Sequence, residues 1–255
     1  MKKALELGRL MLVSPQRAAQ ECESAGALPA ALRLYALTLA ADAVFQTLKP
    51  YDFPDATAAV PAVHQGLSFW IQVALWQPVL MLALIAFAGA LLRWMKDGWL
   101  PLKVVTSFLW TAIPFILLAA YTMQGSVIGK TQFGFLFLAW LAPTAWLVAR
   151  VPRADWRPLA SLLLAMSVVE LAAMLPMAGA VAFRSDAAYK AVAGAAGLWM
   201  LFAGARALKF LPPGRPMPRA LLPLVFASLL QIGVVFVAFT LGWLPAETLK
   251  AIIRV

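Results

Sequence analysis

The sequence predicts an all-α polytopic transmembrane helix bundle with an N-terminal amphipathic interfacial segment. Only 13% of its 255 residues are charged, whereas soluble domains carry about 25%. Its mean hydropathy is +0.84. Apolar runs of about 20 residues, enough for a helix to cross a ~30 Å hydrocarbon layer, recur along nearly the whole chain. Lys and Arg gather in the short connections between these runs.

We expect seven spans, and the first is the least apolar because it carries Arg33 and Asp42. A charge at the centre of a span costs about 2.5 to 3.5 kcal/mol on insertion scales. If this segment does not cross, six spans remain. The expected spans cover residues 29–48, 67–92, 104–123, 133–149, 159–183, 188–209 and 220–244.

The distribution of basic residues predicts the orientation. Alternate connections hold fifteen and six of the Lys and Arg residues, and the richer set includes the N-terminus. Because cytoplasmic loops carry the excess of Lys and Arg, the N-terminus is expected in the cytoplasm and, with seven spans, the C-terminus outside. This contrast also favours a first span that crosses.

Residues 1–28 are expected to form a cytoplasmic segment on the membrane surface, and residues 29–255 the transmembrane domain with short connections. Ser14 and Pro15 predict a helix start, with Ser as N-cap and Pro at the first helical position, and Gly26 predicts its end. A polar helical face before that start holds Lys2, Lys3, Glu6 and Arg9.

Few side chains could support catalysis. The chain has one histidine, His64, and one cysteine, Cys22, far apart in sequence, so neither a Cys/His nucleophile pair nor a His/Cys metal site can form. Asp52 and Asp55 share a proline-rich loop with His64, where a solvated surface is the simplest interpretation. We therefore expect no catalytic residues, cofactor or metal, and no nucleic-acid partner despite a net charge of +10.

Glu170 is the most unusual residue because it falls near the middle of the fifth expected span. The cations that the expected spans place nearest in depth lie at helix ends, roughly 10 Å or more away at 1.5 Å per residue. An unpaired carboxylate is costly at that depth. We therefore expect Glu170 to be protonated and hydrogen-bonded to neighbouring helices.

Other polar side chains are expected at a similar depth. Gln77 lies near the centre of the second span and Gln231 near that of the seventh, while Asp42 and Gln46 are one turn apart on the first. Proline inside a helix frees a backbone carbonyl that another group must satisfy. Such prolines are expected at four positions: Pro78, Pro114, Pro143 and Pro176.

Two interpretations of this polar layer stay open. Its groups can form interhelical hydrogen bonds worth about 0.6 to 2 kcal/mol each, or Glu170 can carry a proton or bind a substrate between kinked helices. The structural interpretation is favoured because no paired cation or second midplane acid completes a relay.

The sixth expected span is rich in Gly and Ala. Ala193, Gly197 and Gly204 lie on nearly the same face, and such stripes let helix backbones approach closely, within the chain or against a partner. Packing within the chain is the favoured interpretation.

Several stretches resemble the Yip family, the Rab-interacting membrane proteins, and its bacterial relatives of similar size. They are "RLMLVSPQRAAQECESAG", "LPLKVVTSFLWTAIPFIL", and "AGLWMLFAGARAL" followed by "RPMPRALLPLVF". They are similar to the family's proline-started amphipathic lead-in, its basic loop before a helix with a central proline (Pro114), and its late Gly-x-Trp helix (Gly197, Trp199). Family members are usually described with about five spans and a Gly-Gly pair where this chain has "KDGW".

The resemblance implies a non-enzymatic integral protein, here of the bacterial inner membrane, that acts in membrane organisation, trafficking or assembly. Its partners would be the lipid bilayer and other membrane proteins. The alternative is a small-solute permease or proton-coupled carrier with a mid-membrane polar site around Glu170.

Overall fold

A computed structural model describes residues 2–50, 53, 66–122, 128–211 and 215–254. All secondary structure in these residues is α-helical, which confirms the predicted fold class. The loop that holds His64, Asp52 and Asp55 lies outside the described residues.

Seven helical segments of the described chain are long and apolar enough to cross a membrane. The count of seven is therefore confirmed by length and composition, and it includes the weakly apolar first segment. The helices are α3 (Ala27–Leu48), α4 (Leu67–Trp94), α5 (Leu100–Thr122), α6 (Lys130–Ala149), α7 (Arg153–Ala165) with α8 (Val168–Ala182), α9 (Asp186–Leu208) and α10 (Met217–Thr240).

The chain divides into two compact units that each combine distant parts of the sequence. Unit 1 contains Met1–Pro78 and Arg157–Arg215, and unit 2 contains Val79–Trp156 and Pro216–Val255. The boundary expected at residue 28, between an interfacial segment and the transmembrane domain, stays a prediction, and so does the interfacial position of residues 1–28.

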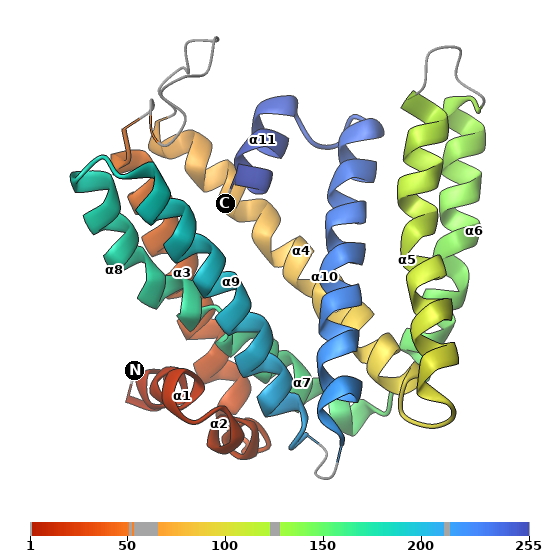
Figure 1. The fold of residues 1–255 in the computed structure, drawn as a ribbon, viewed down its shortest axis with the longest axis horizontal. Coiled ribbons are helices and arrows are strands. Elements are labelled where there is room, and N and C mark those ends of the chain that lie inside the picture. Colours follow the sequence, from red (N-terminus) through yellow and green to blue (C-terminus); the bar gives the residue numbers. More distant parts are fainter. Residues whose placement is uncertain (1, 51–52, 54–65, 123–127, 212–214, 255) are drawn as a thin grey trace. The chain divides into compact units, whose positions relative to one another are not determined.

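Two short helices close one end of unit 1, which we call its base (Figure 1). They are α1 (Lys2–Val13) and α2 (Pro15–Cys22), and α2 begins at the predicted Ser14–Pro15 step with Pro15 in the first turn. Leu7 and Met11 of α1 are fully buried, and α1 packs on α3 and α8, while α2 packs on α9. The N-terminal segment is thus part of the packed core of unit 1.

A close glycine contact, an ion pair and a hydrogen bond hold this base together. A Cβ added to Gly8 of α1 would lie 3.1 Å from Val168 of α8 and 3.4 Å from Leu34 of α3. Lys3 pairs with Glu21 at 3.1 Å, and the hydrogen bond from Lys3 lowers the pKa of Glu21. Arg157 of α7 donates to the carbonyl of Ala25.

The fifth span is broken near its middle, which the sequence analysis did not anticipate. Helix α7 ends at Ala165 and α8 begins at Val168. At the break, both the backbone N–H and the hydroxyl of Ser167 donate to the carbonyl of Leu164, at 3.3 and 2.8 Å. The break places Glu170 in the first turn of α8.

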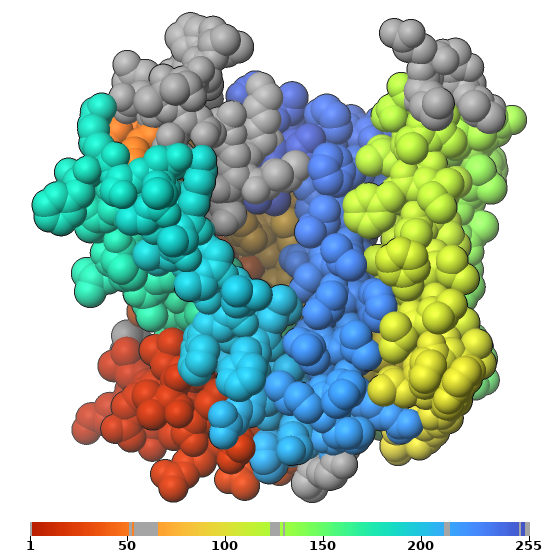
Figure 2. Space-filling view, viewed as in Figure 1, coloured from red at the N-terminus to blue at the C-terminus, as the bar shows by residue number. Residues whose placement is uncertain are grey.

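Unit 2 is built around α5, which packs on α6 and α10. Figure 2 shows α5 running alongside α10. A Cβ added to Gly233 of α10 would lie 3.5 Å from the ring of Pro114 on α5. This spacing lets the part of α5 around Pro114 approach α10 closely.

An aromatic cluster joins α5 to α6. The rings of Trp110 and Trp140 stack with centroids 5.8 Å apart. The Trp140 indole N–H donates to the carbonyl of Trp110 at 3.0 Å, which is the carbonyl left without a helical donor by Pro114, four residues later. The indole of Trp110 in turn donates to Thr144 at 3.1 Å. The freed carbonyl at Pro114 therefore has a partner, as the sequence predicted that it must.

The last expected span ends earlier than predicted. Helix α10 stops at Thr240 and Gly242 adopts a φ of +81°, which glycine reaches without strain. A final amphipathic helix follows, α11 (Ala246–Arg254), which the sequence analysis missed. Thr248, Leu249 and Ala251 are its buried side chains.

We predict that Gly8→Leu separates α1 from α3 and α8, because overpacking at a contact of this kind costs about 1 to 3 kcal/mol. The single cysteine reports the change: Cys22 is 1% exposed, and burial raises the pKa of its thiol to about 12. Alkylation of Cys22 by a maleimide should be slow in the native protein and much faster in the variant. Gly194→Leu is the control, since an added Cβ there meets no atom within 4 Å; equal rates in both variants would contradict the packing.

We predict that Trp140→Phe lowers the free energy of unfolding by about 1 to 3 kcal/mol beyond its loss of apolar contact, because it leaves the Trp110 carbonyl unpaired. Pro114→Ala restores a helical N–H at that position, so the same Trp140→Phe change should cost less in the Pro114→Ala background. A double-mutant cycle of unfolding in detergent measures the coupling. Strictly additive effects would show that the indole does not serve this carbonyl.

Candidate functional site

The strongest candidate site is a row of polar side chains on packed helices of unit 1, which we call the polar seam. Its residues on α3 are spaced by three or four positions, so they share one helix face. That face meets α8, and α8 in turn packs on α9. The seam consists of Tyr35, Thr38, Asp42, Gln46 and Lys49 on α3, Ser167 and Glu170 at the start of α8, and Tyr189 on α9.

A buried hydrogen bond marks the middle of the seam. The Thr38 hydroxyl lies 3.3 Å from the hydroxyl of Ser167 and 3.5 Å from its carbonyl, and it also donates to the carbonyl of Leu34 at 3.1 Å. Thr38 is 1% exposed and Ser167 3% exposed. The break in the fifth span therefore lies where the Thr38 hydroxyl of α3 reaches the backbone carbonyl of Ser167.

Asp42 and Glu170 lie just beyond this hydrogen bond, on neighbouring helices. Both α3 and α8 run away from the base (Figure 1). Asp42 comes four residues after Thr38, and Glu170 three after Ser167, so at 1.5 Å per residue both lie about 5 to 6 Å further along. The two carboxyl groups accordingly interact electrostatically.

Two buried polar groups next to these carboxyls lack a hydrogen-bond partner among the described residues. Gln46 is 5% exposed; its amide N–H donates to Asp42 at 3.2 Å, but its carbonyl oxygen has no donor. Tyr35 is 8% exposed, and its unpaired hydroxyl lies within electrostatic range of Glu170. Glu170 itself is exposed at the surface of the protein. A buried polar atom without a partner is rare and calls for a physical explanation.

The seam continues to the end of unit 1 opposite the base, which we call the far end. There the Lys49 ammonium lies 3.5 Å from the Tyr189 hydroxyl and 5.4 Å from the centre of its ring. Tyr189 also interacts with Gln46 and Asp42, and Lys49 with Asp42. The polar groups thus form a continuous path from mid-span to the far end.

The structure brings together only some of the residues predicted for the polar layer. Asp42 and Glu170 lie on the packed helices α3 and α8 of unit 1, and Gln46 donates to Asp42. Gln77 is half-buried in the part of α4 that belongs to unit 1, and Gln231 is half-buried on α10 in unit 2. A role for Gln77 and Gln231 at the same site stays a prediction.

Five members of the seam were not predicted from the sequence: Tyr35, Thr38, Lys49, Ser167 and Tyr189. The signal that could have found the first three is their spacing around Asp42 and Gln46, which repeats a helical period through the least apolar span. Ser167 has no such signal, because it matters only through the break in the fifth span and the approach of α3.

The small-residue stripe on α9 is only partly buried. Gly204 is buried, whereas a Cβ added to Gly197 would meet no atom within 4 Å and Ala193 is half-buried. Close packing of this face, within the chain or against a partner, stays a prediction.

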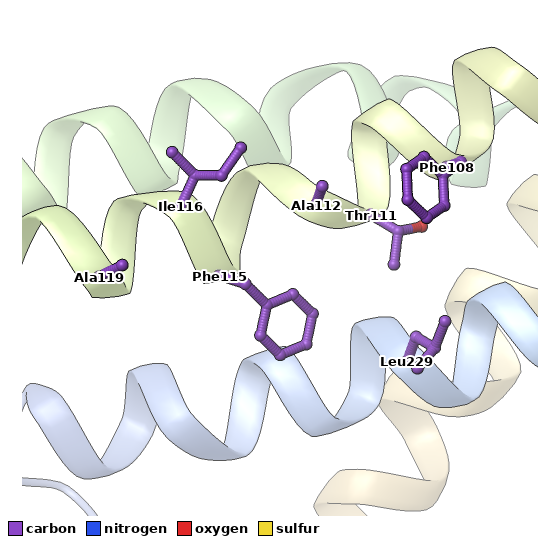
Figure 3. A pocket seen from close by; sticks show the side chains of 7 residues that line it. All are labelled: Phe108, Thr111, Ala112, Phe115, Ile116, Ala119 and Leu229. Carbon is purple, nitrogen blue, oxygen red and sulfur yellow. The ribbon is translucent and has the colours of Figure 1, made fainter.

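Unit 2 has a shallow apolar groove of about 370 Å³ between α5 and α10. Figure 3 shows Phe115 pointing from α5 toward α10, where Leu229 lies. Apart from Thr111, whose hydroxyl donates to the Ser107 carbonyl at 2.7 Å, every lining side chain is a hydrocarbon. The groove has the chemistry of a lipid-facing surface.

The described residues contain no group of three or more His, Cys, Asp or Glu side chains that could hold a metal ion. Cys22 is buried with a thiol pKa raised to about 12, so almost none of it is thiolate at neutral pH. The seam offers instead two carboxyls, an amide oxygen and hydroxyls within the membrane-spanning part of unit 1, which can bind a proton or a small cation.

No family model matches this chain, and neither a curated protein nor a solved structure matches it significantly.

Proposed function

We propose that this multi-pass membrane protein is a non-enzymatic protein of Yip type that acts as a membrane organisation, trafficking or assembly partner. The observation that carries the proposal is the base of unit 1. There α1 and α2 pack firmly on three membrane-spanning segments and expose Lys2, Arg9 and Arg17. This placement supports an inner-membrane protein with the base and the N-terminus in the cytoplasm and the C-terminus outside, as the positive-inside rule predicts.

The base suits binding to another molecule because its two helices are already folded and packed in the free protein. Leu7, Met11 and Ala18 are fully buried, so the backbone of α1 and α2 is held by the core while the opposite face stays available. Leu5 and Val13 are 58% and 80% exposed beside the basic residues. A preorganised surface that mixes cationic and apolar side chains fits an anionic bilayer surface with a membrane-protein partner.

We predict that Arg9→Glu with Arg17→Glu reduces recovery of a stoichiometric membrane partner by about tenfold or more when the protein is purified from native membranes after crosslinking. The reason is reversed charge at the exposed face of the base. Arg93→Glu with Arg153→Glu changes the net charge equally at exposed positions elsewhere and should leave recovery unchanged. A wild-type protein that is monodisperse and has no crosslinked partner would refute the partner function.

A second candidate function is a proton-coupled carrier of a small solute. The polar seam favours it, since Asp42 and Glu170 meet on neighbouring spans beside a broken helix, and broken helices with mid-membrane acids are typical of transport sites. This function does not exclude binding of a partner at the base.

We predict that, if the chain is a carrier, Glu170→Gln abolishes its pH-dependent flux in proteoliposomes while the unfolding temperature changes little, because the amide keeps the shape but cannot exchange a proton. Glu23→Gln, which removes an exposed carboxylate at the base, is the control and should retain flux. Proton movement, followed with an internal pH dye across an imposed gradient, gives the measurement. Equal rates for the wild type and Glu170→Gln would assign the acid a structural role only.

A further inference from the structure

We propose that the polar seam holds a site for one monovalent cation, Na⁺, bound by the Asp42 and Glu170 carboxylates and the Gln46 amide oxygen in competition with a proton. This inference deepens the carrier function, because it names the ion that the seam would exchange for a proton. It concerns binding and stands apart from the proposed partner function.

The donor atoms set the class of ligand. Among the side chains of Asp42, Glu170, Gln46 and Tyr35, every polar atom except the Gln46 amide nitrogen is an oxygen. Hard cations prefer such donors, and softer transition metals need imidazole or thiolate. Carboxylates alone do not make a site, but two further donors here are buried and unpaired.

Those two donors are the independent sign of a ligand. The Gln46 carbonyl oxygen has no partner although Gln46 is 5% exposed, and its amide is held toward Asp42 by the 3.2 Å hydrogen bond. The Tyr35 hydroxyl has no partner although Tyr35 is 8% exposed, and it lies in range of Glu170. A cation between the carboxylates would give the Gln46 oxygen the positive partner it lacks.

Charge balance selects a single positive charge. The charged and titratable groups of the seam are Asp42, Lys49, Glu170, Tyr35 and Tyr189, and the two tyrosines are neutral at physiological pH. With both carboxyls ionised, Lys49, which interacts with Asp42, leaves the seam with one net negative charge. One Na⁺ or one proton neutralises it, whereas a divalent ion would leave an excess positive charge in a region where unbalanced charge is costly.

The seam also offers a route to this position. Gln46, Tyr189 and Lys49 continue the row of polar groups from the carboxyl pair to the far end. On the other side, the hydrogen bond between Thr38 and Ser167 and the packed base, with Leu7 and Met11 fully buried, close the path. The cation would therefore exchange through the far end of unit 1.

The proposal predicts that Na⁺ displaces a proton. The full-length protein in lipid nanodiscs, in weak buffer with a pH-indicator dye, should release one proton for each Na⁺ bound when NaCl is added. Choline chloride at equal ionic strength should release none. While the site is protonated, the apparent Kd for Na⁺ should rise about tenfold for each unit by which the pH falls, because the two ions compete.

Matched variants test the ligands. Asp42→Asn and Glu170→Gln should lose the proton release and the rise in unfolding temperature with NaCl, and Gln46→Leu and Tyr35→Phe should raise the Na⁺ concentration needed for it. Glu23→Gln removes an exposed carboxylate at the base and should behave as wild type. Tyr35→Phe keeps the ring and its packing, so it stays informative if a carboxyl variant does not fold.

Two results would overturn the site: equal proton release with NaCl and choline chloride in the wild type, or undiminished Na⁺-dependent release in Asp42→Asn or Glu170→Gln. Release that depends on Na⁺ and on both carboxyls supports it, whether or not the proteoliposomes show flux. If the wild-type protein binds Na⁺ but shows no flux in proteoliposomes, only the carrier function is refuted. If no partner binds at the base, only the partner function is refuted.

Discussion

The structure of this protein depends on the lack of hydrogen-bonding solvent in the hydrocarbon layer. A helix makes its own backbone hydrogen bonds. Each proline or break leaves a backbone group without its helical partner, and a neighbouring side chain must then supply the hydrogen bond. At Pro114 the freed carbonyl of Trp110 receives the Trp140 indole N–H. At the break in the fifth span, the hydroxyls of Ser167 and Thr38 serve the loosened backbone. Each interruption thus lies where another helix supplies a polar side chain, from the next helix at Pro114 and from a distant one at Ser167.

The same constraint gives the two units different chemistry. In unit 2 the carbonyl that Pro114 frees in α5 is met by an aromatic side chain, Trp140, and the groove between α5 and α10 is nearly free of polar atoms. In unit 1 the interruption is met by hydroxyls and lies next to two carboxyls, an amide and a lysine. A polar environment that already includes hydroxyls lowers the cost of a nearby carboxylate. This difference makes unit 1 the part of the protein in which ion chemistry can take place.

The base and the seam are coupled by packing. Helix α1 contacts both α3 and α8, the two helices that carry Asp42 and Glu170, and Gly8 sets how closely it approaches Val168 and Leu34. A partner that moved α1 would change its packing against α3 and α8, the helix pair that carries most of the seam. Because tightly packed elements transmit small displacements, α1 links the proposed binding surface of unit 1 to the proposed ion site.

The sequence by itself determined the class of protein and its spans, because hydropathy and helical length are local properties: the seven segments and the interior prolines follow from them, and so did the singling out of Glu170. Only the tertiary structure decided which groups meet. Asp42 joins Glu170 because α3 packs on α8, while Gln77 and Gln231, which share the same expected depth, belong to different units. The docking of α1 and α2 on α3, α8 and α9 likewise depends on contacts between distant segments. Depth in the membrane can be counted along a helix, but the direction that a side chain faces is set by its neighbours.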